Sequence, residues 1–502
     1  MTAAARSPRG SGRSRGHRRD GGTGRGTRQA TSAAGPLLGR HLDLDVGPVA
    51  HGGHCVARYE GRVVFVRHAL PGERVVALVT EDGGGSYCRA DAVEIRTPSP
   101  DRVEPPCPHA GPGRCGGCDW QHASTAVQRR LKAAVVREQL ARLAGLPDLP
   151  VTVEPLPVAG APDGLLGWRT RVRFAVAPDG TVGLRRHRSH EVEPVRECPL
   201  GTPEVAAAGV GERRWPAAAE VAVVASSGGD RVILVQPSHG GRPVREAGPP
   251  TVREEAAGRR WEVSAGGFWQ AHVAAADTLA RCVLDLLAPR PGETVLDLYA
   301  GSGLFAGVLA AALGPSGHVI AIEAAPAAAR DAVANLRPAP APGVAASATA
   351  VPAAASAVPV SATAVPATAS AVPAATSAGS ASAPPAVAVA GAASAAPATV
   401  RAAPVTPELL AALERRPNLV VLDPPRAGAG RAVMRAVLDL APRAVAYVAC
   451  DPASFARDLR VALDAGYRLA QFRAFDCFPM TAHVETVALL VPATPESAAA
   501  GA

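Results

Sequence analysis

Lysine is almost absent from this chain of 502 residues, in which Lys132 stands alone beside 51 arginines. Alanine is abundant as well, a composition typical of a GC-rich coding sequence, so the excess of arginine does not by itself indicate a nucleic-acid-binding protein. An apolar run suited to a membrane is also missing. Residues 338–404 are apolar by count, but proline recurs among the alanine, valine, serine and threonine, which excludes a membrane-spanning helix.

A secretory signal is missing too, because no hydrophobic stretch follows the basic N-terminal residues. We therefore expect a cytoplasmic protein that does not contact a membrane. Thiols stay reduced in that compartment, so the nine cysteines are better assigned to metal binding or catalysis than to disulfides.

Positive charge is concentrated in an N-terminal arm, residues 1–40. Nine arginines stand there against one acid, Asp20, so the arm accounts for the net charge of +8 and the remainder is close to neutral. An Arg/Gly/Ser segment cannot bury a core, so we expect it to be disordered and attracted to a polyanion. The alternative is a solvated tail without function, or a wrongly chosen start codon.

The length predicts about three domains. Residues 41–98 carry short β-type runs separated by glycine and proline, which predicts a small β-barrel. Residues 99–265 are mixed α+β and contain a cysteine cluster, a basic apolar helix at about 129–143, and a hairpin that turns at Asp179-Gly180.

Strands and helices alternate over residues 266–490, which predicts a doubly wound, Rossmann-like α/β sheet. The expected strands are 293–298, 317–322, 418–422 and 444–449; the expected helices are 271–288, 303–313, 325–336, 406–415, 430–440 and 453–465; an antiparallel section at 468–492 closes the domain. Residues 338–404 read as a disordered linker inserted in a loop, and residues 491–502 as a disordered tail.

A glycine turn follows the first of these strands. The sequence Tyr299-Ala300-Gly301-Ser302-Gly303 comes directly after it, and Glu323 follows the next strand. Gly301 and Gly303 allow close backbone approach and positive φ, and an acid at the second strand end can bind a ribose diol. The turn also fits a loose dinucleotide fingerprint, so a nicotinamide-dependent oxidoreductase is a competing interpretation.

Cys450 is the candidate nucleophile. It ends a predicted buried strand that Pro452 stops, and open α/β sheets bind their ligands at such strand ends. Asp423, Arg426 and Glu485 are near it in sequence, and a thiol, two carboxylates and an arginine together indicate covalent chemistry. Methylation of a ring carbon requires such a thiol, whereas a dehydrogenase does not. A buried inert thiol is the common alternative for any single cysteine.

Four further cysteines form a candidate metal site: Cys107, Cys115, Cys118 and Cys198. Three of them share a Pro/Gly-rich loop, and the fourth follows the predicted hairpin. Three clustered thiols and a distant fourth can hold a four-iron cluster. Four cysteines also suit structural zinc, which stays open on spacing alone.

Together these motifs resemble one family, the bacterial S-adenosylmethionine-dependent RNA uracil-5-methyltransferases, and most closely the branch that methylates 23S ribosomal RNA. The family's nucleophile motif, Ser-Cys-Asn-Pro, appears here as Ala449-Cys450-Asp451-Pro452, and its base motif, Phe-Pro to His-x-Glu, lies at 478–485. The resemblance covers about residues 42–490 without the linker. It implies an RNA-binding TRAM β-barrel, a central domain with a cysteine-held [4Fe-4S] cluster, and a class I methyltransferase domain.

The resemblance also implies roles for individual residues. Cys450 would be the nucleophile and Glu485 the general base. The cluster ligands would be Cys107, Cys115, Cys118 and Cys198, and the residues that bind S-adenosylmethionine would be Gln270, Tyr299, Gly301, Gly303, Glu323 and Asp423. Two positions depart from the family pattern, since His272 and Leu304 stand where asparagine is usual.

The implied activity is methyl transfer from S-adenosylmethionine to carbon 5 of a uridine in 23S rRNA, by a monomer, through a covalent adduct with Cys450. Uridine in tRNA is the alternative substrate. A TRAM-type RNA-binding protein without catalytic activity is the alternative from another class, and the intact Cys450 and Glu485 argue against it.

Overall fold

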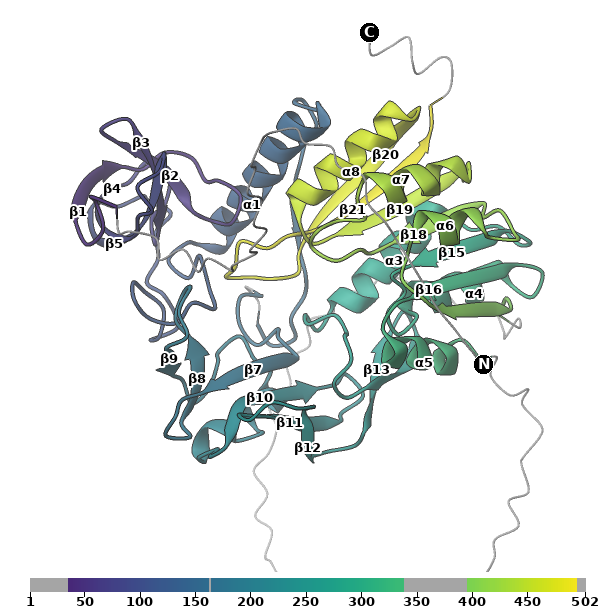
Figure 1. Ribbon diagram of the computed structural model, residues 1–502, viewed down its shortest axis with the longest axis horizontal. Coiled ribbons are helices and arrows are strands. Elements are labelled where there is room, and N and C mark those ends of the chain that lie inside the picture. Colours follow the sequence, from purple (N-terminus) through teal and green to yellow (C-terminus); the bar gives the residue numbers. More distant parts are fainter. Residues whose placement is uncertain (1–34, 162–163, 338–394, 494–502) are drawn as a thin grey trace, which may run out of the picture.

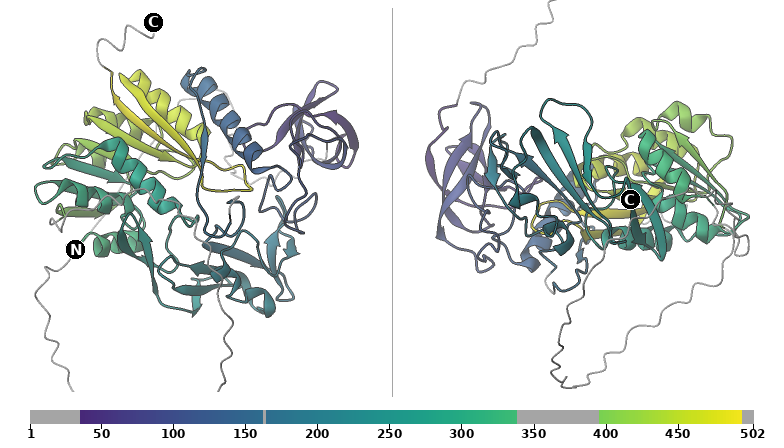
Figure 2. Two further views of the ribbon diagram at one scale, coloured as in Figure 1. Left: turned by 180° about the vertical axis from the view of Figure 1, so that it is seen from behind. Right: turned by 90° about the horizontal axis from the view of Figure 1, so that it is seen from below.

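The computed structural model describes residues 35–161, 164–337 and 395–493 (Figures 1 and 2). Most of the predicted arm (1–34) and of the predicted linker (338–394), and residues 494–502 of the predicted tail, lie outside the described residues. In the described part, the chain forms sheets of five, six, two and eight strands. None of the helices found there is both long and apolar enough to cross a membrane.

The N-terminal domain is a five-stranded sheet in the order β1-β4-β5-β3-β2. Its strands are β1(His41–Asp45), β2(Cys55–Tyr59), β3(Arg62–Arg67), β4(Arg74–Glu81) and β5(Tyr87–Thr97). In β1, Leu42 and Leu44 are buried and alternate with exposed polar residues. Register shifts between β4 and β5 bend the sheet. The edge strands β1 and β2 contact each other, so the sheet curls into the small barrel expected at 41–98.

The middle of the chain builds a second, antiparallel sheet in the order β12-β11-β10-β7-β8-β9. Its strands are β7(Arg171–Val176), β8(Val182–Arg185), β9(Val192–Pro194), β10(Ala218–Ala225), β11(Arg231–Pro237) and β12(Val244–Ala247). The short helices α2(Pro203–Ala206) and η2(Val210–Glu212) and the hairpin β13(Thr251–Ala256)–β14(Arg259–Ser264) accompany it. The predicted turn at Asp179-Gly180 joins β7 to β8, and Gly180 has a φ of 83°.

The C-terminal part forms the eight-stranded sheet, in the order β17-β16-β15-β18-β19-β21-β20-β6. Its strands are β15(Thr294–Leu298), β16(His318–Glu323), β17(Ala398–Ala402), β18(Leu419–Leu422), β19(Ala444–Ala449), β20(Tyr467–Asp476), β21(Glu485–Pro492) and β6(Val153–Pro155). The helices are α3(Ala275–Leu287), α4(Leu304–Leu313), α5(Pro326–Asn335), α6(Pro407–Ala411), α7(Arg431–Asp439) and α8(Pro452–Asp464). The strands from β17 to β19 are parallel and β21 is antiparallel to β19, as the predicted alternation and closing section require.

Both faces of this sheet are covered. Successive residues of β15 point to opposite faces, so Val295 belongs to the core beneath α3 and α4, and Leu296 to the core beneath α7 and α8. A sheet buried on both faces explains why its strands are continuous apolar runs instead of alternating ones.

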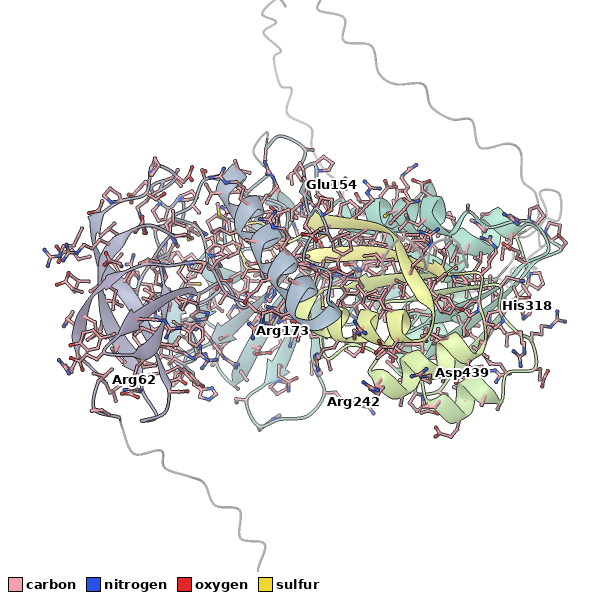
Figure 3. All side chains as sticks on the ribbon, turned by 90° about the horizontal axis from the view of Figure 1, so that it is seen from above. Arg62, Glu154, Arg173, Arg242, His318 and Asp439 are labelled. Carbon is pink, nitrogen blue, oxygen red and sulfur yellow. The ribbon has the colours of Figure 1, made fainter. Side chains whose placement is uncertain are left out.

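The predicted boundary at residue 265 does not separate the middle of the chain from this sheet. The helix α1(Thr125–Gln139), its π-helical extension η1(Leu140–Ala144) and β6 precede the boundary, yet β6 pairs with β20 and η1 packs on α8. Glu154 of β6, which is labelled in Figure 3, forms an ion pair with Arg473 of β20 at 2.6 Å. The chain therefore contributes a strand to the eight-stranded sheet before it builds the antiparallel sheet.

The helix α1 has two apolar faces, which explains this arrangement. Val127 and Val135 belong to the core of the N-terminal barrel, whereas Val136 belongs to the core of the eight-stranded sheet. The helix consequently lies between the two, as Figures 1 and 2 show from opposite sides.

Two predicted ends are wrong. The linker was expected to run to residue 404, but residues 398–402 form β17, which pairs in parallel with β16. The tail was expected from residue 491, but β21 continues to Pro492. β17 is the edge strand of the sheet and β21 lies between β19 and β20, and in both places a ladder of backbone hydrogen bonds orders residues whose composition resembles their surroundings.

Deletion of residues 341–392 should leave the melting temperature close to that of the full chain, because the ends of this insertion need only to meet. A deletion that extends through residue 402 removes β17 and the buried Ala396, and exposes the edge of β16. It should lower the melting temperature by roughly 4–8 °C, as expected for a loss of about 2 kcal/mol in a domain of this size. Thermal unfolding of both variants tests this, and equal melting temperatures would contradict the role of β17.

Candidate active site

The candidate site lies at the end of the eight-stranded sheet where its parallel strands finish. We call this end the carboxyl edge. Because β15, β16, β18 and β19 are parallel, their carboxyl ends share this edge, and β21, which is antiparallel, begins there. The chain runs outward from β15 to β16 and β17, then returns to β18 on the other side, so the strand order reverses at β15. Open α/β sheets bind ligands at such a switch point.

The pairing register places the predicted residues in a row. Leu298 lies opposite Ile322 on one side and Leu422 on the other, so Tyr299, Glu323 and Asp423 follow neighbouring strand ends. Further along the edge, Leu422 pairs with Tyr447 and Ala449 pairs with Thr486. Cys450 and Glu485 come directly after the last pair of that antiparallel ladder, so they lie close together at the start of β21.

The glycine turn forms one half of the site. Gly301 and Gly303 have φ of 56° and 90°, and α4 begins immediately after them. Both carboxylate oxygens of Glu323 accept backbone N–H groups, from Gly301 at 2.8 Å and from Ala325 at 2.7 Å. The acid at the second strand end is therefore fixed against the turn, in the position suited to a ribose diol.

A buried acid lies beneath the turn. Asp297 of β15 accepts the N–H of Ala306 in the first turn of α4 at 2.8 Å. Burial, with smaller contributions from Asp423 and Glu323, raises its pKa to about 8, and the hydrogen bond from Ala306 opposes this rise. The switch point thus concentrates acidic groups away from water, an environment that favours a cationic ligand group.

Cys450 and two carboxylates form the other half. Burial first, then Glu485 and Asp423, raise the pKa of the Cys450 thiol to about 12, and Arg426 opposes them. The Glu485 side chain is almost completely buried, and burial and the neighbouring Asp423 raise its pKa. Burial raises the pKa of Asp423 as well. The thiol is thus protonated at neutral pH in the free protein, beside groups that can exchange protons with it.

Two local features favour the thiolate. Cys450 lies one residue before Asp451, which caps α8 by accepting the N–H of Ser454 at 2.8 Å. The positive end of a helix dipole lowers the pKa of a nearby thiol. Arg426 contributes a second positive charge, and its side chain bonds to Nε2 of His483 at 3.1 Å.

A residue of the N-terminal barrel also reaches this site. His51 Nε2 is 2.9 Å from Oδ2 of Asp451, so a loop of the barrel contacts the loop that carries Cys450. The contact raises the pKa of His51 and lowers that of Asp451 to about 2. No sequence signal identifies this pair, because 400 residues separate its members.

Gln270 is buried in the part of the chain just before α3. It lines a cavity of about 220 Å³ with Thr170, Ser227, Glu254 and His272, and neither Tyr299 nor Glu323 lines that cavity. The ring of His272 stacks on Trp168. A cofactor contact for Gln270 stays a prediction.

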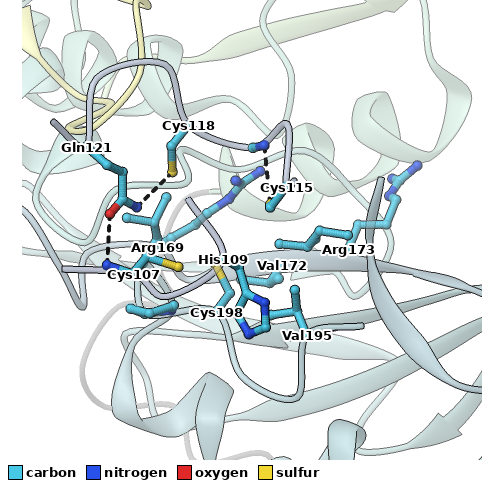
Figure 4. Close-up of a pocket in the computed structure, with 14 residues that line it drawn as sticks. Cys107, His109, Cys115, Cys118, Gln121, Arg169, Val172, Arg173, Val195 and Cys198 are labelled. Carbon is cyan, nitrogen blue, oxygen red and sulfur yellow. Dashed lines mark hydrogen bonds between the residues drawn. The ribbon is translucent and has the colours of Figure 1, made fainter. Parts of the chain in front are cut away.

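The four candidate metal ligands line one cavity of about 50 Å³, in the antiparallel-sheet part of the molecule (Figure 4). Gln121 joins two of them, donating to Sγ of Cys118 at 3.2 Å and accepting the N–H of Cys107 at 3.1 Å. The N–H of Gly117 points at Sγ of Cys115 at 3.4 Å. All nine cysteines lie in the described residues, and each is a free thiol.

The cavity does not have the geometry of a single-ion site. Among the described residues, no three His, Cys, Asp or Glu side chains converge closely enough to hold one metal ion. Four thiols around a small apolar-walled cavity form a donor set that suits a multinuclear sulfide cluster, because its irons lie at separate corners.

Family models match three parts of the chain. A TRAM domain model matches residues 37–93, a tRNA (Uracil-5-)-methyltransferase model matches residues 413–492, and a protein-L-isoaspartate(D-aspartate) O-methyltransferase model matches residues 262–377. The first match is the barrel, and the second contains Asp423, Cys450 and Glu485.

Curated relatives match over almost their whole length. An uncharacterized RNA methyltransferase of Streptomyces avermitilis is 44% identical over 91% of this chain and 99% of the relative, and one of Streptomyces coelicolor is 44% identical over 91% and 94%. One of Bifidobacterium longum is 32% identical over 87% and 93%.

A solved structure shares the fold. The Pyrococcus abyssi tRNA (uracil-54, C5)-methyltransferase, in complex with S-adenosyl-L-homocysteine, covers 90% of this chain and 100% of its own with a TM-score of 0.59, at 19% identity. The identity to the Streptomyces proteins and the domain matches lead to one conclusion: this chain is a member of the RNA uracil-5-methyltransferase family, a class I S-adenosylmethionine-dependent enzyme with an N-terminal TRAM domain.

Proposed function

We propose that this enzyme transfers a methyl group from S-adenosylmethionine to carbon 5 of a uridine in 23S rRNA, through a covalent adduct with Cys450. The observation that supports this most strongly is the pairing of β19 with β21, which brings Cys450 close to the buried Glu485, at the same edge of the sheet as the glycine turn. S-adenosylmethionine supplies an electrophilic methyl group. Glu323, the glycine turn and Tyr299 are the residues that we expect to hold it, on the β16 and β15 side of the edge.

The chemistry explains why both Cys450 and Glu485 are needed. Carbon 5 of uracil is a poor nucleophile, so it does not attack a methyl group at a useful rate. Addition of the Cys450 thiolate to carbon 6 converts the ring to an enolate. Carbon 5 then forms a bond to the methyl group while the bond between that group and the sulfonium sulfur breaks, and S-adenosylhomocysteine is the leaving group. Glu485 removes the proton from carbon 5, the bond between sulfur and carbon 6 breaks, and the double bond of the ring is restored.

The electrostatics of the free site fit this sequence of steps. Burial and the neighbouring Asp423 raise the pKa of Glu485. Its carboxylate is therefore a stronger base than an exposed carboxylate. Loss of the proton from the Cys450 thiol requires that its pKa fall from the value in the free site. A uracil ring between Cys450 and Glu485 would separate the thiol from one of the carboxylates that raise this pKa. The ring face must reach the thiol, so the uridine has to leave its stack and enter the site.

Transfer RNA is the alternative substrate. The matched family model and the Pyrococcus abyssi protein both carry names that refer to tRNA. We favour 23S rRNA because the motifs of the chain, taken together, resemble the ribosomal branch most closely. A monomer is the form that we expect to act. An RNA-binding protein without activity is disfavoured by the placement of Cys450 opposite Glu485.

We also propose that Cys107, Cys115, Cys118 and Cys198 hold a [4Fe-4S] cluster. The fit rests on four thiols around one cavity, on the N–H groups that point at two of the sulfurs, and on the poor match to a single-ion site in the described residues. The cluster would stabilise this part of the fold and position RNA, because methyl transfer requires no change of redox state.

Cys450→Ala should abolish 5-methyluridine formation and also the stable adduct with 5-fluorouridine RNA, because fluorine blocks the release step only after the thiol has added. Glu485→Gln should slow release by about 10²–10⁴-fold and trap methylated RNA on the enzyme, the range typical of a lost general base. Cys282→Ala, which removes a buried thiol of α3, is the matched control and should behave as wild type. Denaturing gels and nucleoside mass spectrometry measure both steps, and methylation by the Cys450→Ala variant would contradict the covalent mechanism.

Protein purified under anaerobic conditions should be brown and contain about four irons per chain. Cys118→Ala should lose the iron, whereas Cys88→Ala, a buried thiol of the N-terminal barrel, should retain it. Metal analysis and the visible absorption spectrum decide this. Stoichiometric zinc without iron would refute the cluster.

A further inference from the structure

The single lysine of the chain is completely buried. Lys132 lies on α1 with none of its side chain exposed, although 51 arginines supply the other basic side chains. Among the arginines and the lysine of the described residues, Lys132 is the most completely buried, ahead of Arg67 at 6% exposure. A compact ammonium and a planar guanidinium are not interchangeable in a closed space.

The ammonium has two partners, both at the end of β20. Nζ of Lys132 lies 2.5 Å from Oδ1 of Asp476 and donates to the carbonyl oxygen of Phe478 at 3.0 Å. Asp476 is buried as well. Buried ion pairs contribute little net stability, because removing two charges from water offsets their attraction. The pair is therefore better explained by what it holds in place.

The segment that it holds leads directly to the proposed base. β20 ends at Asp476, β21 begins at Glu485, and residues 477–484 connect them; we call this connection the base loop. Lys132 fixes the first part of the base loop. Gln128, one turn earlier on the same face of α1, accepts the N–H of Met480 at 2.8 Å.

The rest of the base loop is held from the same segment of the chain. Oδ2 of Asp119 accepts the N–H of Ala482 at 2.9 Å. The N–H groups of Asp119 and Trp120 donate to the carbonyl oxygen of Met480 at 2.9 and 3.0 Å. Side chains and backbone groups of residues 119–132 thus contact the base loop along its length.

Met480 shows that these contacts impose a conformation. Its φ is 68°, in the left-handed region that a side chain such as methionine rarely adopts, and its side chain is buried. Such a backbone persists only where surrounding contacts determine it, and it is typical of functional sites.

We infer that Lys132 is a positioning residue: paired with Asp476, it anchors the base loop and thereby sets the place of Glu485 against the uracil ring. This inference rests on the proposed function. The backbone of Cys450 is held by β19 and the capped start of α8, whereas Arg426, which favours its thiolate, bonds to His483 of the base loop. Lys132 should therefore act most strongly on proton removal, the step that Glu485 performs, and less on formation of the adduct.

The test compares the two steps in Lys132→Met and Lys132→Arg under single-turnover conditions with a uridine-containing RNA fragment. Methyl groups in enzyme-bound RNA report formation of the adduct, and free methylated RNA reports release. We expect formation close to the wild-type rate and release slowed about 100-fold, the effect of a displacement near 1 Å at a catalytic group. Lys132→Arg should not rescue release, because the guanidinium does not fit between Asp476 and Phe478.

Two controls separate position from stability. Arg443→Met breaks the Arg443–Glu293 ion pair at the opposite edge of the sheet and should lower the melting temperature without changing the ratio of release to formation. The double variant Lys132→Met/Asp476→Asn leaves no unpaired buried charge, so it should recover stability while release stays slow.

Release and formation that fall in proportion in the Lys132 variants, or a double variant with wild-type release, would show that Lys132 only stabilises the fold. A wild-type enzyme that forms neither adduct nor 5-methyluridine would instead refute the proposed function, and with it this role. The wild-type measurement alone distinguishes failure of the proposed function from failure of the role of Lys132.

Discussion

The whole site depends on one constraint, the parallel pairing of β16, β15, β18 and β19. Neighbouring strands lie about 4.8 Å apart, so residues that follow successive strands are brought within a few ångströms whatever their separation in sequence. Glu323, Asp423 and Cys450 follow such strands, and Glu485 begins the antiparallel β21 beside them. The order along the edge places Glu323, the proposed ribose-binding acid, at one end and Cys450 and Glu485, the proposed nucleophile and base, at the other.

The base loop and the loop that carries Cys450 both contact parts of the chain outside this sheet. Asp119 and Lys132 hold the base loop, and Asp119 comes directly after Cys118 of the cysteine cavity. His51 of the N-terminal barrel contacts Asp451 beside the nucleophile. The domain that we expect to bind RNA and the proposed cluster site are thus connected to the chemistry by direct hydrogen bonds, which gives RNA binding a physical route to the reacting groups.

Much of this arrangement could be predicted from the sequence, because its signals are local. The alternation of apolar strands and helices after residue 293, the Asp-Gly hairpin and the position of Cys450 at a strand end each depend on a few neighbouring residues. β6 and α1 could not be assigned to the sheet in this way, since the apolar face of a helix does not reveal its partner. β17 was missed because its residues resemble the adjacent alanine- and valine-rich insertion. Pairs such as His51 with Asp451 exist only in the folded chain.

The central claim is that this chain methylates carbon 5 of a uridine in RNA. The most direct measurement is mass-spectrometric mapping of 5-methyluridine in ribosomal and transfer RNA from a strain that lacks the protein. In that strain, one uridine of 23S rRNA should lack its methyl group. Expression of the wild-type chain should restore the methyl group, whereas expression of the Cys450→Ala chain should not. An unchanged map of 5-methyluridine in both classes of RNA would contradict the account.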